Sequence, residues 1–180
     1  MPRCAVYTTM PVVQVATIRS GLELRSLLPG DGSAYADLLR SSAEHLTRHG
    51  DYVDAVAAPA DVHAAAFAEL DPRHNFGIYE NDLLVGSVEL VPHDPPKFGL
   101  GYLLAHSACG RGIATLAVHA AAGHARSTHI ATDLFAGVTH GNHKSVAVLQ
   151  RVGFARIATF ETYARYHLDL ARLPALPGHP

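Results

Sequence analysis

Cysteine is scarce in this 180-residue chain, which has only Cys4 and Cys109. Two cysteines in such different surroundings cannot build a disulfide framework, so the sequence predicts a reducing, cytoplasmic location. The net charge is only -2, and it excludes the strong positive excess that nucleic acid or an anionic membrane surface would attract. No apolar run approaches the roughly 18 residues of a membrane-spanning helix. The stretch 12–18 lacks the flanks of a signal peptide.

Several well-known binding motifs are also missing. The chain has no Gly-x-Gly-x-x-Gly dinucleotide motif and no P-loop. Among its 13 histidines, His45 and His49 are spaced like a metal-ligand pair, but no Glu follows His45 and no cysteine cluster accompanies them. We therefore expect no metal cofactor and interpret the histidines as surface or packing residues.

Apolar residues make up 48% of the chain and charged residues 17%, which is typical of a folded globular protein. The length suits one domain with a sizeable core. We predict an arm or extra strand over residues 1–20, one domain over 21–170, and a flexible, proline-containing tail over 171–180.

The order of predicted elements indicates an α/β fold with a mixed sheet. The predicted strands span 22–27, 75–80, 83–91, 98–105, 131–139, 154–160 and 163–170. The predicted helices span 34–48, 59–70, 112–127 and 142–152. Asn81-Asp82 is a two-residue hairpin turn, 92–97 is predicted to be a loop, and Asp31 or Ser33 is the expected cap of the first helix.

A glycine-containing turn joins the strand at 98–105 to the Ala-rich helix that follows. Its sequence is Cys109-Gly110-Arg111-Gly112-Ile113-Ala114-Thr115. Glycines permit a tight bend and close approach of a ligand, and the free N–H groups of the helix start favour an anion. The turn therefore indicates a phosphate or pyrophosphate site, although a turn of this kind also occurs for structural reasons alone.

A second signal begins at Asn142, which is in position to cap a helix that ends before Gly153. Ser145 lies one turn into this helix and shares a face with Leu149. Taken singly, Asn142 is explained by capping alone, and Ser145 is an ordinary polar residue of a first helical turn.

Taken together, these features resemble the GCN5-related N-acetyltransferase (GNAT) superfamily and, within it, the RimJ/RimL-like branch. The resemblance spans roughly residues 22–170. It is carried by Leu24-Arg25, Asp31, Val85-Gly86, Gly101-Tyr102, the segment 110–115, Asn142, Ser145 and Gly153-Phe154. It implies a single-domain GNAT-like fold with a mostly antiparallel mixed sheet, a splayed pair of central strands and helices on both faces.

The resemblance also implies acetyl-CoA as co-substrate and assigns residues to its binding. Backbone groups of Leu103, Leu104 and Ala105 would line the pantetheine arm, and Asn142 would bond to it. The N–H groups of 110–115 would bind the pyrophosphate. Cys109 stands where relatives have Gln or Arg, so it would complete the phosphate loop. Leu149 stands where many members have a Tyr that protonates the leaving thiolate. The RimJ/RimL-like branch instead has Ser at the position of Ser145, with its hydroxyl near the sulfur, so Ser145 would donate this proton.

The expected activity is acetyl transfer to a primary amine of a small molecule, such as an antibiotic, polyamine or amino-acid derivative, or of a protein N-terminus. The amine must lose a proton, for which we choose Glu89, with His93, Asp94 and Glu161 as later candidates. Acidic residues of the helical region, Glu44, Asp51, Asp54 and Asp61, either attract a cationic amine or form a solvated face.

A second hypothesis is a non-catalytic acyl-CoA-binding sensor or partner module of the same fold. It draws support from the departures at Cys109 and Leu149, and from Gly99, which stands where the branch often has Glu. Leu116 is a further departure, in a helix where a Glu is common. The sequence is also compatible with a homodimer.

Overall fold

The computed structural model describes residues 12–128 and 130–176. Its strands are β1 (Gln14–Ala16), β2 (Leu22–Ser26), β3 (Asn75–Glu80), β4 (Leu83–Asp94), β5 (Lys97–Leu104), β6 (Asp133–Thr139), β7 (Ala155–Thr159) and β8 (Tyr163–Asp169). Its α-helices are α1 (Gly32–Ser41), α2 (Ala43–Thr47), α3 (Val53–Ala57), α4 (Ala60–Glu69), α5 (Ile113–Ser127) and α6 (His143–Val152). Three 3-10 turns complete the list: η1 (Pro29–Asp31), η2 (His106–Ala108) and η3 (Leu170–Arg172).

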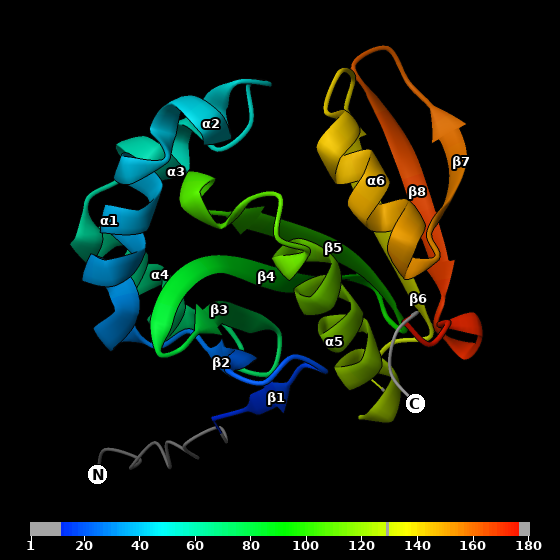
Figure 1. The fold of residues 1–180 in the computed structure, drawn as a ribbon, viewed down its shortest axis with the longest axis horizontal. Helices are drawn as coiled ribbons and strands as arrows, with labels where there is room; N and C mark the ends of the chain where they lie inside the picture. Colours follow the sequence, from blue (N-terminus) through cyan, green and yellow to red (C-terminus); the bar gives the residue numbers. More distant parts are fainter. Residues whose placement is uncertain (1–11, 129, 177–180) are drawn as a thin grey trace, which may run out of the picture.

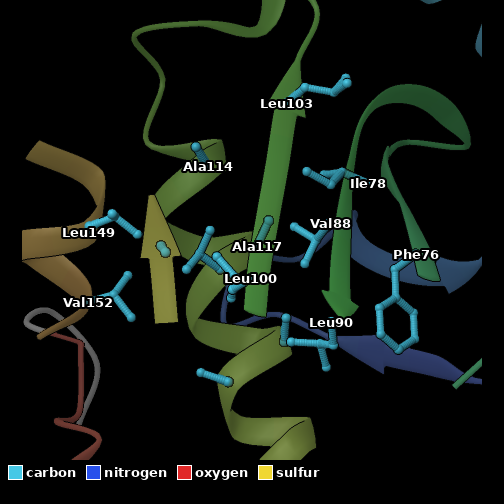
Figure 2. Packing of buried hydrophobic residues seen from close by; sticks show 14 of the residues in the cluster. Phe76, Ile78, Val88, Leu90, Leu100, Leu103, Ala114, Ala117, Leu149 and Val152 are labelled. Atoms are coloured by element: carbon cyan, nitrogen blue, oxygen red, sulfur yellow. The ribbon is translucent and has the colours of Figure 1, made fainter. Parts of the chain in front are cut away.

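The strands form one sheet in the order β1-β2-β3-β4-β5-β6-β8-β7. Neighbouring strands are antiparallel except β5 and β6, which are parallel. Helices cover both faces (Figure 1). Side chains alternate between the faces of a strand: Ser87 of β4 contacts Tyr35 of α1, whereas Val88 lies in the core near α5 (Figure 2). This architecture confirms the predicted α/β fold with a mixed, mostly antiparallel sheet.

The parallel pair separates soon after it forms. β5 and β6 are in register only where Lys97, Phe98 and Gly99 face residues 133–135. Beyond this point β5 continues alongside β4 as far as Leu104, and β6 continues alongside β8 as far as Thr139. The predicted splayed pair of central strands is therefore present, and it opens toward the carboxyl ends of both strands.

Alanines form most of the buried face of α5. The side chains of Ala117, Ala121 and Ala125 are fully buried. Such small side chains let the helix lie close to the sheet, where it packs near Val88 and Leu100 (Figure 2). On the neighbouring helix α6, Leu149 and Val152 reach the same core, as Figure 2 shows. The core thus fixes both helices whose N-termini border the separation of β5 and β6.

Local signals predicted two turns correctly. Asn81 and Asp82 connect β3 to β4 with positive φ angles of 49° and 66°, as a tight hairpin turn requires. Gly153 follows α6 with a φ of 107°, the left-handed conformation that glycine favours at a helix end.

Three local predictions were wrong. The helix expected over 34–48 is broken at Ser42, whose hydroxyl accepts a hydrogen bond from the His106 N–H at 3.1 Å. Most of the loop expected over 92–97 is strand, because β4 runs to Asp94 and β5 begins at Lys97. Asp31, one of the two expected caps, occupies the N-cap position of α1, but its side chain makes no capping hydrogen bond. Its carboxylate accepts instead from the N–H of Leu28 and the hydroxyl of Tyr79.

The predicted arm and tail are described only in part. Residues 14–16 of the arm form the edge strand β1, and residues 1–11, with Cys4, lie outside the described residues. At the other end, Leu173 is buried and the Pro174 carbonyl accepts a hydrogen bond from His119 at 2.7 Å. Residues 177–180 lie outside the description, so the division of the chain at 20 and 170 stays a prediction. None of the described helices is long and apolar enough to cross a membrane.

We predict that two substitutions in α5, at Ala121 and at Gly123, change the free energy of unfolding in opposite directions. Ala121→Leu should lower the free energy of unfolding by about 1–3 kcal/mol, because the buried position has no room for a larger side chain. Gly123→Ala should raise it by about 0.5–1 kcal/mol, because an added Cβ meets nothing within 4 Å and removes the conformational freedom of glycine. Urea unfolding measures both values. A leucine variant as stable as the parent chain would contradict the close packing of α5.

Candidate functional site

The turn between β5 and α5 presents an uncapped helix N-terminus. Gly110 and Gly112 have φ angles of 77° and 76°, so the bend uses the left-handed conformation at both positions. Gly112 occupies the N-cap position, and no described side chain bonds to the first N–H groups of α5. These N–H groups and the positive end of the helix dipole together attract an anion.

A groove of about 730 Å³ begins at this turn and extends along β5 and α6. Ten of the predicted binding residues line it: Leu103, Leu104, Cys109, Gly110, Gly112, Ile113, Ala114, Thr115, Asn142 and Ser145.

Two predicted binding residues do not line the groove. Arg111 directs its guanidinium to Glu80, 2.9 Å away, and its carbonyl accepts a hydrogen bond from Arg19. Ala105 uses its N–H to bond to the carbonyl of Val85. The structure therefore supports a role for the Arg111 side chain in holding the turn against β3.

A second hollow, of about 310 Å³, lies where β5 and β6 separate. Residues of both strands line it, among them Gly101 and Tyr102 of β5 and Val138 and Thr139 of β6. Five residues line both hollows: Asp51, Tyr52, Tyr102, Asn142 and Ser145. The two hollows are thus neighbours, and together they join the uncapped helix start to the opening in the sheet.

The N-terminus of α6 is capped, unlike that of α5. The Asn142 side chain accepts a hydrogen bond from the Ser145 N–H at 3.2 Å, which confirms the predicted cap. The hydroxyl of Tyr102 donates to the Ser145 carbonyl at 3.2 Å and ties β5 to the first turn of α6. Ser145 is half-buried at the border of both hollows, and Leu149 is fully buried behind it.

Positive groups outnumber negative ones along the groove. Its lining includes six basic or potentially basic side chains: His45, Arg48, His49, His143, Lys144 and Arg151. Asp51 is the one carboxylate among the described lining residues. This distribution favours a ligand with several negative charges, such as a phosphorylated one.

Cys109 lies against a histidine inside the groove. Its Sγ is 3.4 Å from Nε2 of His45. Burial raises the pKa of the Cys109 thiol, and burial, together with the smaller effect of neighbouring basic groups, lowers the pKa of His45. Both groups are therefore neutral near pH 7, which argues against a thiolate nucleophile. Among the described residues, no group of three or more His, Cys, Asp or Glu side chains could hold a metal ion. His45 and His49 therefore belong to no such group.

Glu89, the predicted base, lines neither hollow but stands at the edge of the second one. It is paired with Gly101 across β4 and β5, and its Oε1 lies 2.6 Å from where a Cβ at position 101 would be. Although much of the side chain contacts solvent, lost hydration raises the pKa of the carboxyl. Burial raises the pKa values of Tyr35 and Tyr52, and the negative charge of Glu89 adds a smaller effect to both, so Glu89 lies near both side chains.

Sequence reasoning overlooked the tyrosines of this site. The hydroxyl of Tyr52 donates to the Tyr102 carbonyl at 2.9 Å, across 50 residues of sequence. No local pattern marks Tyr52, which follows the expected end of a helix. Tyr102 was noted only as part of the Gly101-Tyr102 pair.

A family model described as an acetyltransferase (GNAT) domain matches residues 22–155 of this chain. No curated protein matches the sequence. Among solved structures, RimJ of Mycobacterium smegmatis in complex with CoA-disulfide aligns with a TM-score of 0.76 and 21% identity, over 91% of this chain and 90% of that chain.

Two further structures show the same fold. The ribosomal-protein-S5-alanine acetyltransferase of Vibrio fischeri aligns with a TM-score of 0.75 and 17% identity, over 91% of this chain and all of that chain. The microcin C7 self-immunity acetyltransferase MccE, in complex with acetyl-CoA and AMP, aligns with a TM-score of 0.71 and 14% identity, over 84% and 93% of the two chains.

We predict that Cys109 is an unreactive thiol near neutral pH. Because burial raises its pKa above the usual value, its thiolate fraction stays small at pH 7.5 and grows only on the alkaline side. Iodoacetamide should alkylate Cys109 more slowly than free cysteine, as followed by mass spectrometry in a Cys4→Ser background. The double variant Cys4→Ser/Cys109→Ser, which has no cysteine, is the negative control for alkylation at other residues. Alkylation at pH 7.5 as fast as that of free cysteine would contradict the neutral pair.

Proposed function

This chain belongs to the GNAT acetyltransferase family, and from this premise we propose that it transfers an acetyl group from acetyl-CoA to a primary amine. The amine attacks the thioester directly while both substrates are bound. The acceptor is an amine of a small molecule (an antibiotic, polyamine or amino-acid derivative) or of a protein N-terminus. The observation that carries this proposal is the groove that joins an uncapped helix start to the opening between β5 and β6.

In the proposed coenzyme site, the two ends of the groove bind different parts of the coenzyme. N–H groups of the segment 110–115 bind the pyrophosphate, and the basic side chains of the lining balance its charge. The pantetheine arm extends along the edge of β5 at Leu103 and Leu104, where β6 is no longer paired, toward the second hollow and beside Asn142. A backbone edge without a partner strand is suited to bind an extended chain in this manner. Two of the similar structures hold such a coenzyme: RimJ of Mycobacterium smegmatis is in complex with CoA-disulfide and MccE is in complex with acetyl-CoA.

The proposed proton acceptor is Glu89. An acceptor amine is mostly protonated near pH 7 and must lose a proton before it attacks. The pKa of Glu89 is raised by lost hydration, and no described group forms an ion pair or hydrogen bond with its carboxylate. It is therefore a better base than an ordinary surface carboxylate.

The leaving thiolate needs a donor and the tetrahedral oxyanion needs a fixed N–H. We assign the first role to the hydroxyl of Ser145, at the border of both hollows. The second role falls to a backbone N–H of β5 at the opening. Leu149 is fully buried and carries no proton to donate, which leaves Ser145 as the candidate on this face of α6.

The function is tested by incubating the chain with acetyl-CoA and a panel of putrescine, spermidine and tetrapeptides with free Ser or Ala N-termini. We expect free thiol to appear together with one acetylated amine, measured by mass spectrometry. Gly112→Val should abolish coenzyme binding in calorimetry, because the left-handed conformation disfavours a β-branched residue and the side chain blocks approach to the N–H groups. Gly50→Ala, at another left-handed glycine with open space around it, is the matched control.

Two results would contradict this proposal. A normal coenzyme affinity in Gly112→Val would remove the turn from the binding site. Tight coenzyme binding by the parent chain without acetylation of any amine would favour the sensor or partner module of the same fold.

Glu89→Gln should lower kcat roughly 100-fold or more, within the range that general-base catalysis supplies. In the parent chain kcat/KM should rise with pH through the raised pKa of Glu89, since only the deprotonated carboxylate accepts a proton. The Gln variant should lose this limb of the profile. Glu161→Gln, at an exposed position between β7 and β8, should behave like the parent chain. An unchanged rate in Glu89→Gln would assign the proton transfer to another group.

A further inference from the structure

We propose that Asp51 is the docking point for the positively charged amine of the acceptor, and that Tyr52 beside it fixes this point at the opening between β5 and β6. The inference deepens the proposed function and rests on it. It selects one carboxylate among the four acidic residues of the helical region that the sequence left as candidates.

The segment Asp51-Tyr52 spans the two strands that separate. Thr139, at the end of β6, donates its hydroxyl to the Asp51 carboxylate, with distances of 3.2 and 3.4 Å to the two oxygens. The hydroxyl of Tyr52 donates to the carbonyl of Tyr102 in β5 at 2.9 Å. Two consecutive residues therefore hold the strands on either side of the opening.

The backbone at Tyr52 shows how this arrangement is reached. Tyr52 has a φ of 58° and a ψ of 11°, a left-handed conformation that is unfavourable for a residue other than glycine. Such conformations persist only where surrounding contacts impose them. Here the contacts are the two hydrogen bonds to β5 and β6, so the position of Asp51 at the opening is fixed by the fold.

The charge of the second hollow points to a cationic ligand. Asp51 is the only charged residue among the described residues that line it. Thr139 uses part of the hydrogen-bonding capacity of the carboxylate, which has about four lone-pair sites. The remaining sites can accept N–H groups of an ammonium, in a charge-assisted hydrogen bond. The permanently charged side chains of the first hollow, Arg48, Lys144 and Arg151, serve the opposite charge, that of a phosphate-bearing ligand.

The other acidic candidates of the region lack this placement. The side chain of Glu44 is 97% exposed and lies 3.9 Å from Arg48. Asp54 and Asp61 are exposed and line neither hollow. Asp54 is three residues from Asp51 and carries the same charge, which makes it a matched control.

The test compares Asp51→Asn with Asp54→Asn, using the member of the amine panel that is acetylated fastest. Asp51→Asn should raise the KM of that amine roughly 10- to 100-fold, the value of one charge-assisted hydrogen bond. Its kcat should change by less than about threefold, and its affinity for the negatively charged coenzyme should not fall, because the variant removes a negative charge from the groove lining. Asp54→Asn should match the parent chain. The KM of the parent should rise with ionic strength, and that of Asp51→Asn should not.

A second pair of variants separates the effect of the Asp51 charge from the effect of its hydrogen bond with Thr139. Thr139→Val removes the hydrogen bond to Asp51 but keeps the negative charge, so its KM should rise less than that of Asp51→Asn. Asp51→Glu should recover part of the lost affinity. An unchanged KM in Asp51→Asn, or an equal rise in Thr139→Val, would overturn the inference.

The inference and the proposed function fail in different ways. If the parent chain acetylates amines and Asp51→Asn has an unchanged KM, only the docking point is wrong. If no amine is acetylated, calorimetric titration of spermidine into the CoA-loaded chain still measures the docking point. Binding that Asp51→Asn abolishes would then support Asp51 and contradict acetyl transfer. Binding equal in both chains, or absent from both, would overturn the docking point as well.

Discussion

The separation of β5 from β6 is the constraint on which the rest of the site depends. Each strand stays bonded to its outer neighbour, β5 to β4 and β6 to β8, while only residues 97–99 and 133–135 pair across the centre. Backbone groups that lose a partner strand must find water, a side chain or a ligand. Tyr52 takes one of them, the carbonyl of Tyr102. The opening is therefore a place where an extended ligand supplies the hydrogen bonds that a strand would otherwise make.

Two helices begin beside this opening, and a described side chain caps the N-terminus of only one of them. Asn142 uses its side chain to satisfy the start of α6. The start of α5 has no such cap, and its left-handed glycines keep side chains away from its N–H groups. Since both helices pack into the same core, the difference lies in two short sequences and not in the architecture. The uncapped end retains an unsatisfied preference for an anion, beside a groove rich in basic side chains.

Features that depend on neighbouring residues could be predicted from the sequence. The hairpin at Asn81-Asp82, the glycine turn and the Asn142 cap follow from backbone requirements within a few positions. Contacts between distant segments could not: the break at Ser42 coincides with a hydrogen bond to His106, and Asp51 meets Thr139 across 88 residues. The resemblance to a known family supplied ten of the residues that line the groove. It could not reveal that Arg111 turns toward Glu80, because that depends on where the end of β3 lies.

The register between β4 and β5 also changes how the absence of a Glu at position 99 is interpreted. Gly99 stands where relatives often have Glu, and this departure favoured a module without catalysis. Yet Glu89 of β4 faces Gly101 of β5, and its carboxylate occupies the space that a side chain at position 101 would fill. A carboxylate on either strand of an antiparallel pair reaches the same patch of sheet surface. The glycine at 101 is thus what admits the neighbouring carboxylate, and the absence of Glu from β5 by itself says little about whether the site can remove a proton.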